Sequence, residues 1–135
     1  MQLVEEHPGS GYVLRAVTAT GLVINGRLLT GSLILMPDRL IEDWRHGDPL
    51  CPADLEPVLA LAPELIVLGT GSRQRFPAPA VLGACLGRGI GIEVMDNAAA
   101  GRTFNVLAAE NRRVAAAFVL EAGPGQPSRS AIRHR

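Results

Sequence analysis

Two short apolar runs mark the middle of the chain, Leu65 to Leu68 and Ile90 to Met95, and both predict buried β-strands. Between them, Pro79 to Leu86 predicts a helix, because the segment is apolar, opens on a proline and is followed by Gly87. The residues of this helix expected to face the core are Val81, Leu82 and Leu86. Since a helix connects the two strands, we expect them to run parallel in one sheet.

The residues after the second strand predict another helix and then a last strand. Asp96-Asn97 supplies an N-cap, and the apolar spacing favours a helix over Ala98 to Asn111. The segment Arg112 to Leu120 fits either an extension of that helix or a strand at the end of the fold. We favour the strand, because Glu110-Asn111 resembles a turn.

The first half of the chain has a β pattern. Tyr12 to Thr18 alternates weakly and predicts a strand. The dipeptide Asn25-Gly26 is typical of a type I′ turn, which predicts a hairpin that pairs Leu22–Ile24 with Leu28–Leu29. Ser32 to Met36 is apolar without alternation and predicts a strand covered on both faces.

The segment that links the two halves is less regular. Arg39 to Trp44 predicts a short strand with Trp44 half buried. Cys51 to Pro57 has the prolines and acids of a first helical turn, and we expect this helix to continue to Pro63. A β-rich half followed by strand–helix units implies a layered α+β or α/β domain.

Length and composition fit one domain with a tail. The chain has 135 residues, of which 47% are hydrophobic, enough for a sizeable core. We expect a single globular domain over residues 1–121. From residue 122 on, small and polar residues dominate and three arginines stand without an acid, so residues 122–135 predict a disordered basic tail.

Charge and hydropathy exclude several classes of protein. The formal net charge is zero, so we expect no nucleic-acid partner. No apolar run reaches about 18 residues and the first residues are acidic, so we expect no membrane insertion and a cytoplasmic protein. All 13 basic residues are arginines, which excludes lysine chemistry. Cys51 and Cys85 match no metal spacing, and two reduced thiols are favoured over one disulfide.

The candidate site lies where the two parallel strands end, because such strand ends face a common crevice. The loops there are Gly69-Thr70-Gly71-Ser72 and Asp96-Asn97, with Arg73, Arg75 and Arg102 nearby in the sequence. Glycines allow close backbone approach, while hydroxyls and guanidinium groups can hold an anion. The alternative is structural: the glycines make turns, Asp96 caps a helix, and Arg102 pairs with an acid.

Catalysis and cofactor binding have weaker support. The glycine loop lacks the third glycine of a dinucleotide fingerprint and no Walker lysine follows it. Ser72 and Cys85 are potential nucleophiles, but no histidine lies in the strand-end loops to act as a base; the histidines are His7, His46 and His134. The acidic residues between Asp38 and Asp54 indicate a solvated surface rather than a metal site. We therefore assign no catalytic residue, no metal and no cofactor.

The second half resembles a known family. The motifs are PELIVLGTG, then FP and a helix, then GIGIEVMDNAAAGRTFNVLAAENRRVAAAF. They resemble the domain of unknown function 498 family, which has the Mth-938-like fold. The family includes a mitochondrial assembly factor for respiratory complex I and an adipogenesis-associated animal protein. The resemblance implies an α+β fold of three layers (β+β/α), with an N-terminal hairpin region and a βαβα unit on a mixed sheet.

The family motif falls on particular positions of this chain. Its signature residues would be Gly69, Thr70, Gly71, Asp96, Arg102, Thr103 and Asn105. Many members have a cysteine where Gly101 stands, and often a tyrosine for Phe104. A role for a thiol in this loop is therefore not expected in this chain.

These observations lead to three hypotheses. The first is a non-enzymatic binding module that helps to assemble a membrane or respiratory complex, with a protein segment or small anion in the crevice. Its candidate residues are Gly69, Thr70, Gly71, Ser72, Asp96, Asn97, Arg102, Thr103 and Asn105. The second is a small-molecule enzyme that uses the same crevice. The third is a structural homo-oligomer with Trp44 and Phe76 in its interface.

Overall fold

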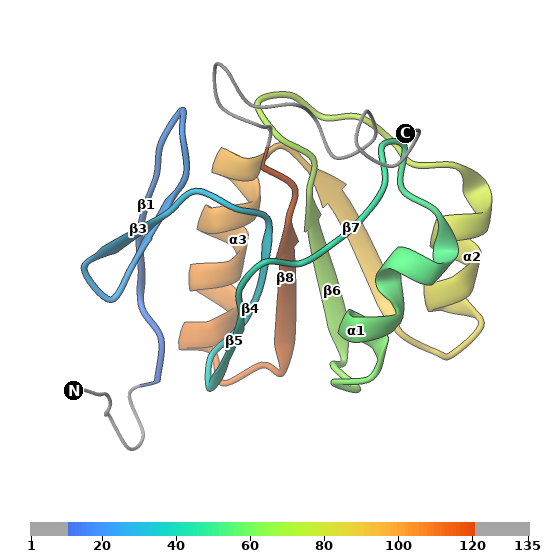
Figure 1. Cartoon of the computed structure of the whole chain (residues 1–135). Coiled ribbons are helices and arrows are strands. Elements are labelled where there is room, and N and C mark those ends of the chain that lie inside the picture. Colours follow the sequence, from blue (N-terminus) through green and yellow to red (C-terminus); the bar gives the residue numbers. More distant parts are fainter. Residues whose placement is uncertain (1–10, 121–135) are drawn as a thin grey trace.

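A five-stranded mixed sheet forms the centre of the computed structural model, which describes residues 11–120 (Figure 1). In chain order its strands are β4 (Leu33–Met36), β5 (Arg39–Ile41), β6 (Leu65–Gly69), β7 (Gly91–Met95) and β8 (Val114–Phe118). Their order in the sheet is β5-β4-β8-β6-β7. β6 runs parallel to both β7 and β8, whereas β4 runs antiparallel to β8 and β5.

A second, antiparallel sheet comprises three strands in the order β1-β2-β3. They are β1 (Leu14–Val17), β2 (Leu22–Ile24) and β3 (Arg27–Leu29). Asn25 and Gly26 have φ values of 50° and 80°, as a type I′ turn requires, so the predicted hairpin is confirmed. The expected strand over 12–18 is also present, with a register irregularity between Leu14 and Ala16.

Helices separate and cover the sheets. The longest, α3 (Asn97–Ala109), contacts β6, β7 and β8 and also β1, so it lies between the two sheets (Figure 1). The 3₁₀ helix η1 (Pro52–Leu55) and the helices α1 (Glu56–Leu59) and α2 (Pro79–Leu86) cover the opposite face of the five-stranded sheet. The fold is α+β, with an N-terminal hairpin sheet and a mixed central sheet, as the sequence predicts.

Alternation along the central strands explains why both faces of the sheet are buried. On β6, Ile66 and Leu68 join the core beneath the short helices, whereas Val67 joins the core beneath α3. On β8, the central strand, Ala115 and Ala117 face the short helices. Small alanines at the middle of the sheet let the covering layers pack closely. Because both faces of β6 and β8 are buried, the apolar residues along these strands follow one another without a polar residue between them.

The parallel pairing of β6 with β7 is confirmed, and so is the strand over 112–120, which is β8. Three expectations about local structure are wrong. Leu86 is 60% exposed, because Val81 and Cys85 are the buried residues of α2. Trp44 is fully buried, and its indole Nε1 donates to Asp54 O at 2.9 Å.

The helix expected over 51–63 is the third correction. It forms only η1 and α1, which end at Leu59. Ala62 has a φ of 51°, a left-handed conformation that a continuing helix cannot contain.

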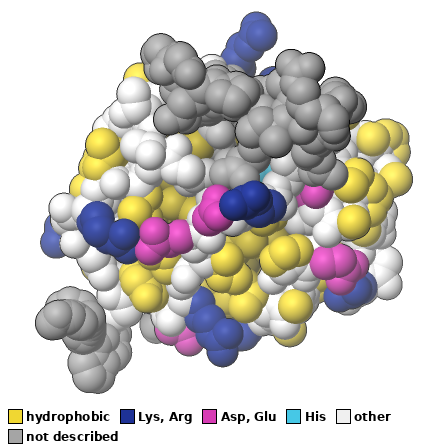
Figure 2. Space-filling model, in the orientation of Figure 1, with side chains coloured by type: hydrophobic (Ala, Val, Ile, Leu, Met, Phe, Trp, Pro, Cys, Tyr) yellow, Lys and Arg dark blue, Asp and Glu magenta, His cyan; other side chains and the backbone are white. Residues whose placement is uncertain are grey.

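Part of the exposed apolar surface lies on α2 and the loop before it. No residue from Phe76 to Gly87 carries a charge, and Phe76 is 69% exposed. Figure 2 shows hydrophobic side chains gathered at the right of the molecule, where Figure 1 has α2. Charged side chains elsewhere on this face of the molecule are interspersed with hydrophobic ones.

Close packing between β1 and α3 depends on a glycine. A Cβ added at Gly101 would lie 2.8 Å from Val17 Cγ2 and 3.2 Å from Leu14 Cδ2. The first distance is shorter than van der Waals contact, so the side chain of Val17 or β1 itself would have to shift. Gly83, in the middle of α2, has no atom within 4 Å of such a Cβ.

These two helical glycines provide a matched test of the packing. Alanine at Gly83 should stabilise the fold by about 0.5–1 kcal/mol, because alanine has the higher helix propensity. Alanine at Gly101 should instead destabilise it by about 1 kcal/mol, since overpacking outweighs that gain. Urea unfolding measures both, and equal stabilisation by the two substitutions would show that β1 does not rest on Gly101.

Candidate functional site

The two strand-end loops meet at one edge of the sheet. Thr70 N donates to Met95 O at 2.9 Å, and Asn97 N donates to Gly71 O at 2.9 Å. The loops therefore lie side by side, as parallel pairing of β6 and β7 requires. We call this region, Gly69 to Ser72 with Asp96 and Asn97, the strand-end junction.

Asn97 connects the strand-end junction to the central strand. Its side chain is 7% exposed, and Oδ1 accepts from Gly71 N at 3.1 Å while Nδ2 donates to Val119 O at 2.9 Å. Val119 N in turn donates to Gly69 O at 2.9 Å. Gly69 must be a glycine here, because a Cβ would collide with Asn97 Oδ1. One amide side chain thus links the ends of β6 and β8 to the first residue of α3.

Thr70 and Asp96 also use their side chains within the fold. Thr70 Oγ1 accepts from Arg75 N at 3.0 Å and donates to Arg73 O at 2.7 Å. Asp96 Oδ1 accepts from Ala99 N at 2.8 Å, which makes it the predicted N-cap of α3. Ser72 is exposed. The polar side chains of the junction hold its loops in place, and their role in binding stays a prediction.

The three candidate residues on α3 point in different directions. Thr103 Oγ1 lies 3.3 Å from the sulfur of Met95, on the side of β7. Asn105 Nδ2 donates to Leu14 O at 3.1 Å, on the side of β1. Arg102 is exposed and makes no ion pair with a residue in the described range.

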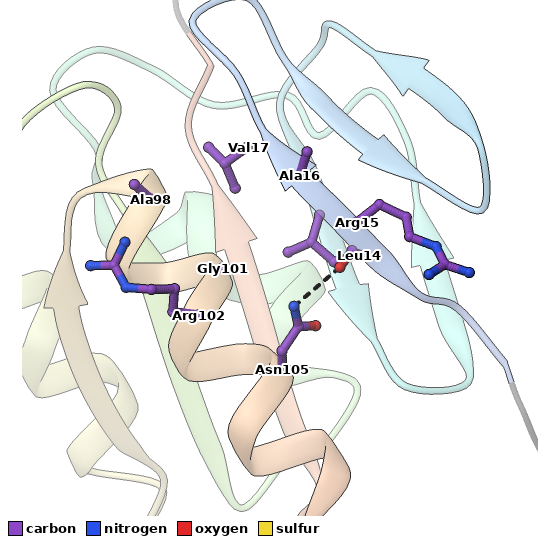
Figure 3. A pocket seen from close by; sticks show the side chains of 8 residues that line it. All are labelled: Leu14, Arg15, Ala16, Val17, Ala98, Gly101, Arg102 and Asn105. Carbon is purple, nitrogen blue, oxygen red and sulfur yellow. Dashed lines mark hydrogen bonds between the residues drawn. The ribbon is translucent and has the colours of Figure 1, made fainter.

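A groove of about 190 Å³ runs along the contact between β1 and α3 (Figure 3). It is lined by Leu14, Arg15, Ala16, Val17, Ala98, Gly101, Arg102 and Asn105. Two arginines and no acidic residue are among these lining residues. In Figure 3 the side chains of Arg15 and Arg102 extend away from the groove in opposite directions, which leaves small residues between them.

Sequence reasoning identified Arg102 and Asn105 as site residues but missed Arg15 and the groove itself. Arg15 lies more than 80 positions from α3 in the sequence, and no local pattern indicates that β1 packs beside that helix. The packing at Gly101 and the hydrogen bond from Asn105 to Leu14 O bring β1 and α3 together.

A serine–histidine pair is the second feature that the sequence did not reveal. His46 Nε2 lies 2.9 Å from Ser32 Oγ, and Nδ1 lies 2.9 Å from Gly47 O. Because a carbonyl can only accept, Nδ1 carries the proton and Nε2 accepts from the hydroxyl. Such a pair can activate a nucleophile. Here Ser32 is fully buried and also accepts from Leu120 N at 2.8 Å, so the pair connects the start of β4 to the residues that follow β8.

The remaining reactive groups give no further site. Both cysteines are free thiols, and burial raises the pKa of Cys85, which leaves it less thiolate and less reactive. Between residues 11 and 120 no three acidic, histidine or cysteine side chains cluster as a metal site would need. Nor does that part of the chain contain a helix with the length and hydropathy to cross a bilayer.

Asp54 departs from the expected solvated acidic surface. It is buried, and its carboxylate accepts from Cys51 N at 2.9 Å and Gly47 N at 3.2 Å. The neighbouring Glu42 and Asp48 are exposed and lie near Arg27 and Arg75 respectively, as surface ion pairs.

Comparison with known proteins gives one family. The model of the family described as "Protein of unknown function (DUF498/DUF598)" matches residues 14–119. NADH dehydrogenase [ubiquinone] 1 alpha subcomplex assembly factor 3 of Danio rerio is 31% identical over 88% of this chain and 70% of its own length. The chain spans 60% to 70% of the length of six vertebrate proteins with this name.

Solved structures agree with the fold. A Xanthomonas campestris protein solved by NMR is 50% identical, has a TM-score of 0.77 and covers 94% of this chain, which spans all of that protein. A Bordetella pertussis protein described as an Mth938-like domain is 23% identical and has a TM-score of 0.71; the match covers 100% of this chain and 98% of the Bordetella chain. At this identity, the Bordetella protein supports the expected fold alone.

The strand-end junction predicts a large effect for one amide side chain. Asn97→Ala should lower the free energy of unfolding by about 2–4 kcal/mol, because Gly71 N–H and Val119 C=O lose their partner in a buried place. Ser72→Ala, in the same loop but exposed, should change it by less than about 0.5 kcal/mol. Thermal and urea unfolding measure both free energies of unfolding. Similarly small effects of Asn97→Ala and Ser72→Ala would contradict the bridging role of Asn97.

Proposed function

Because the chain belongs to the DUF498/DUF598 family, we propose that it is a non-enzymatic binding module that assists the assembly of a membrane or respiratory protein complex. In this proposal the bound partner is a protein segment with a carboxylate, held in the groove between β1 and α3. The groove adjoins the strand-end junction and includes Arg102 and Asn105 of the predicted site.

The charge of the groove carries the proposal. Arg15 and Arg102 stand on the two sides of the groove with their guanidinium groups turned outward, and no acidic side chain lines the space between them. Neither arginine makes an ion pair with a described residue, so each side chain can turn toward an incoming carboxylate without breaking such a pair. A guanidinium fork binds a carboxylate through two hydrogen bonds, and arginine is enriched at the centres of protein interfaces.

The small residues of the groove support a protein partner. Ala16, Ala98 and Gly101 leave room for a side chain or a chain terminus between the two arginines. A volume of about 190 Å³ fits a side chain rather than a whole cofactor. A free anion of similar charge could occupy the same space, and it would then compete with the protein segment.

The strand-end junction contributes by positioning. Asp96 caps α3 and Asn97 fixes its first residue to the sheet, which sets where Arg102 emerges one and a half turns later. The names of the vertebrate relatives, which are assembly factors, support the wider role in assembly. A cytoplasmic location and the alternative of a small-molecule enzyme stay predictions.

Affinity purification tests the groove. With the chain as bait in a native extract, Arg102→Ala should reduce recovery of the copurifying protein about tenfold, as expected when a charge-assisted contact is lost. Arg39→Ala is the matched control, because Arg39 is exposed on β5 and also makes no ion pair with a described residue. Equal recovery with the two variants, or no partner with the unmodified bait, would contradict the proposal.

A further inference from the structure

We propose that the outer edge of β7 is a second binding site, at which an extended segment of a partner protein that carries a basic residue adds to the sheet as a sixth strand. This inference goes beyond the groove between β1 and α3, since it concerns another surface and main-chain hydrogen bonds. It depends on three features of β7: unpaired main-chain groups, apolar neighbours on both flanking helices, and a single free charge.

Within residues 11–120, the main-chain groups on one side of β7 have no strand beside them. β7 is the last strand of the sheet and pairs only with β6 (Figure 1). Met95 O accepts from Thr70 N, so Met95 faces β6 and, by alternation, Ile92 and Val94 face outward. Among residues 11–120, nothing bonds to the N–H groups of Ile92 and Val94 or to the carbonyl of Ile92.

One group on this edge is already hydrogen-bonded in the manner of an added strand. Gln74 Nε2 donates to Val94 O at 2.9 Å from the outer side. This side-chain amide occupies the place that a main-chain N–H of a neighbouring strand would take. Because Gln74 is exposed and lies in a loop, it can give way to such a strand.

Apolar side chains lie on the helices that flank β7. α3 contacts one face of the strand, and its Val106 is 57% exposed. Val106 follows Thr103, which touches Met95, by three residues, so it lies on the same side of the helix, toward β7. On the other face α2 contacts β7, and its Leu86 is 60% exposed. An added strand with apolar residues on both faces would cover part of this surface.

The charge of Glu93 determines which kind of segment can pair with β7. Glu93 is the one charged residue of β7, lies at its centre, and is exposed without an ion pair to any described residue. A second copy of this chain that paired Ile92 with Val94 would put the two Glu93 side chains opposite each other, which is destabilising. A charge on an edge strand is a known protection against such self-pairing. An arginine or lysine opposite Glu93 would instead be favourable, so we infer a different protein with a basic residue at the centre of its segment.

Synthetic peptides test the site directly. The probe is a nine-residue peptide that alternates valine and threonine around a central arginine, and the comparison peptide has a central glutamate. In NMR titration of the full chain, the arginine peptide should shift and protect the amides of Ile92 and Val94. It should bind about threefold tighter than the glutamate peptide, because an opposite-charge pair across two strands is favourable and a like-charge pair is not.

Variants of β7 separate main-chain pairing from side-chain effects. Val94→Pro removes an outward N–H that bonds to nothing within the described residues, so the fold should persist while binding falls at least tenfold. Val94→Thr keeps the N–H and the shape, and should bind within about twofold of the unmodified chain. Should Val94→Pro not fold, Glu93→Lys still decides, because it should reverse the preference between the two peptides.

Several outcomes would overturn the inference. Amide shifts confined to β1 and α3, or unchanged binding by both Val94→Pro and Glu93→Lys, would exclude the edge as the site. A concentration-dependent dimer in sedimentation that Glu93→Lys abolishes would assign the edge to a second copy of this chain. Arg102→Ala should leave peptide binding unchanged, which keeps the failure of this site distinct from failure of the groove.

Discussion

The hydrogen bonds of Asn97 are the contact on which the rest of the structure depends. Its amide joins Gly71 at the end of β6 to Val119 after β8, while its main chain begins α3. Three segments that are distant in the sequence are thus held at one edge of the sheet. This arrangement fixes the positions of both the groove beside α3 and the outer edge of β7.

Burial of this amide constrains the surrounding residues. The carbonyl and N–H groups that it satisfies would otherwise be unpaired in a place with little water, which costs more than a typical hydrogen bond contributes. Gly69 has to lack a side chain to admit Asn97 Oδ1. The glycines and small polar residues of the strand-end junction therefore have structural roles, and the two surfaces proposed to bind partners lie to either side.

The two proposed binding surfaces differ in charge. In the proposals, Arg15 and Arg102 beside the groove bind a carboxylate, whereas the β7 edge binds a basic strand through main-chain hydrogen bonds and Glu93. Their opposite charge preferences would allow the chain to hold two different segments at once. Neither surface requires the buried Ser32–His46 pair, which stabilises the approach of β8 to β4.

Local signals account for most of the fold that the sequence predicted. The Asn25-Gly26 turn, the strand end at Met95 and the Asp96 cap each depend on neighbouring residues and are confirmed, and β6 runs one residue beyond the expected Leu68. Of the incorrect expectations, the helix over 51–63 fails at the local backbone of Ala62, whereas those for Leu86 and Trp44 concern contacts between distant segments.

Leu86 was expected to be buried because α2 is apolar on all sides, and only the packing on the sheet distinguishes its faces. Arg15 and His46 were missed for the same reason: their partners lie far along the chain, and no short pattern indicates them.

Amide hydrogen exchange of the free chain tests the central claim, that the strand-end junction is a structural element rather than an open ligand site. The account predicts that the amides of Gly71, Asn97 and Val119 exchange as slowly as the core strands, through global unfolding only. Exchange at these three amides as fast as at Ser72 would show that the junction opens locally, and would contradict the account.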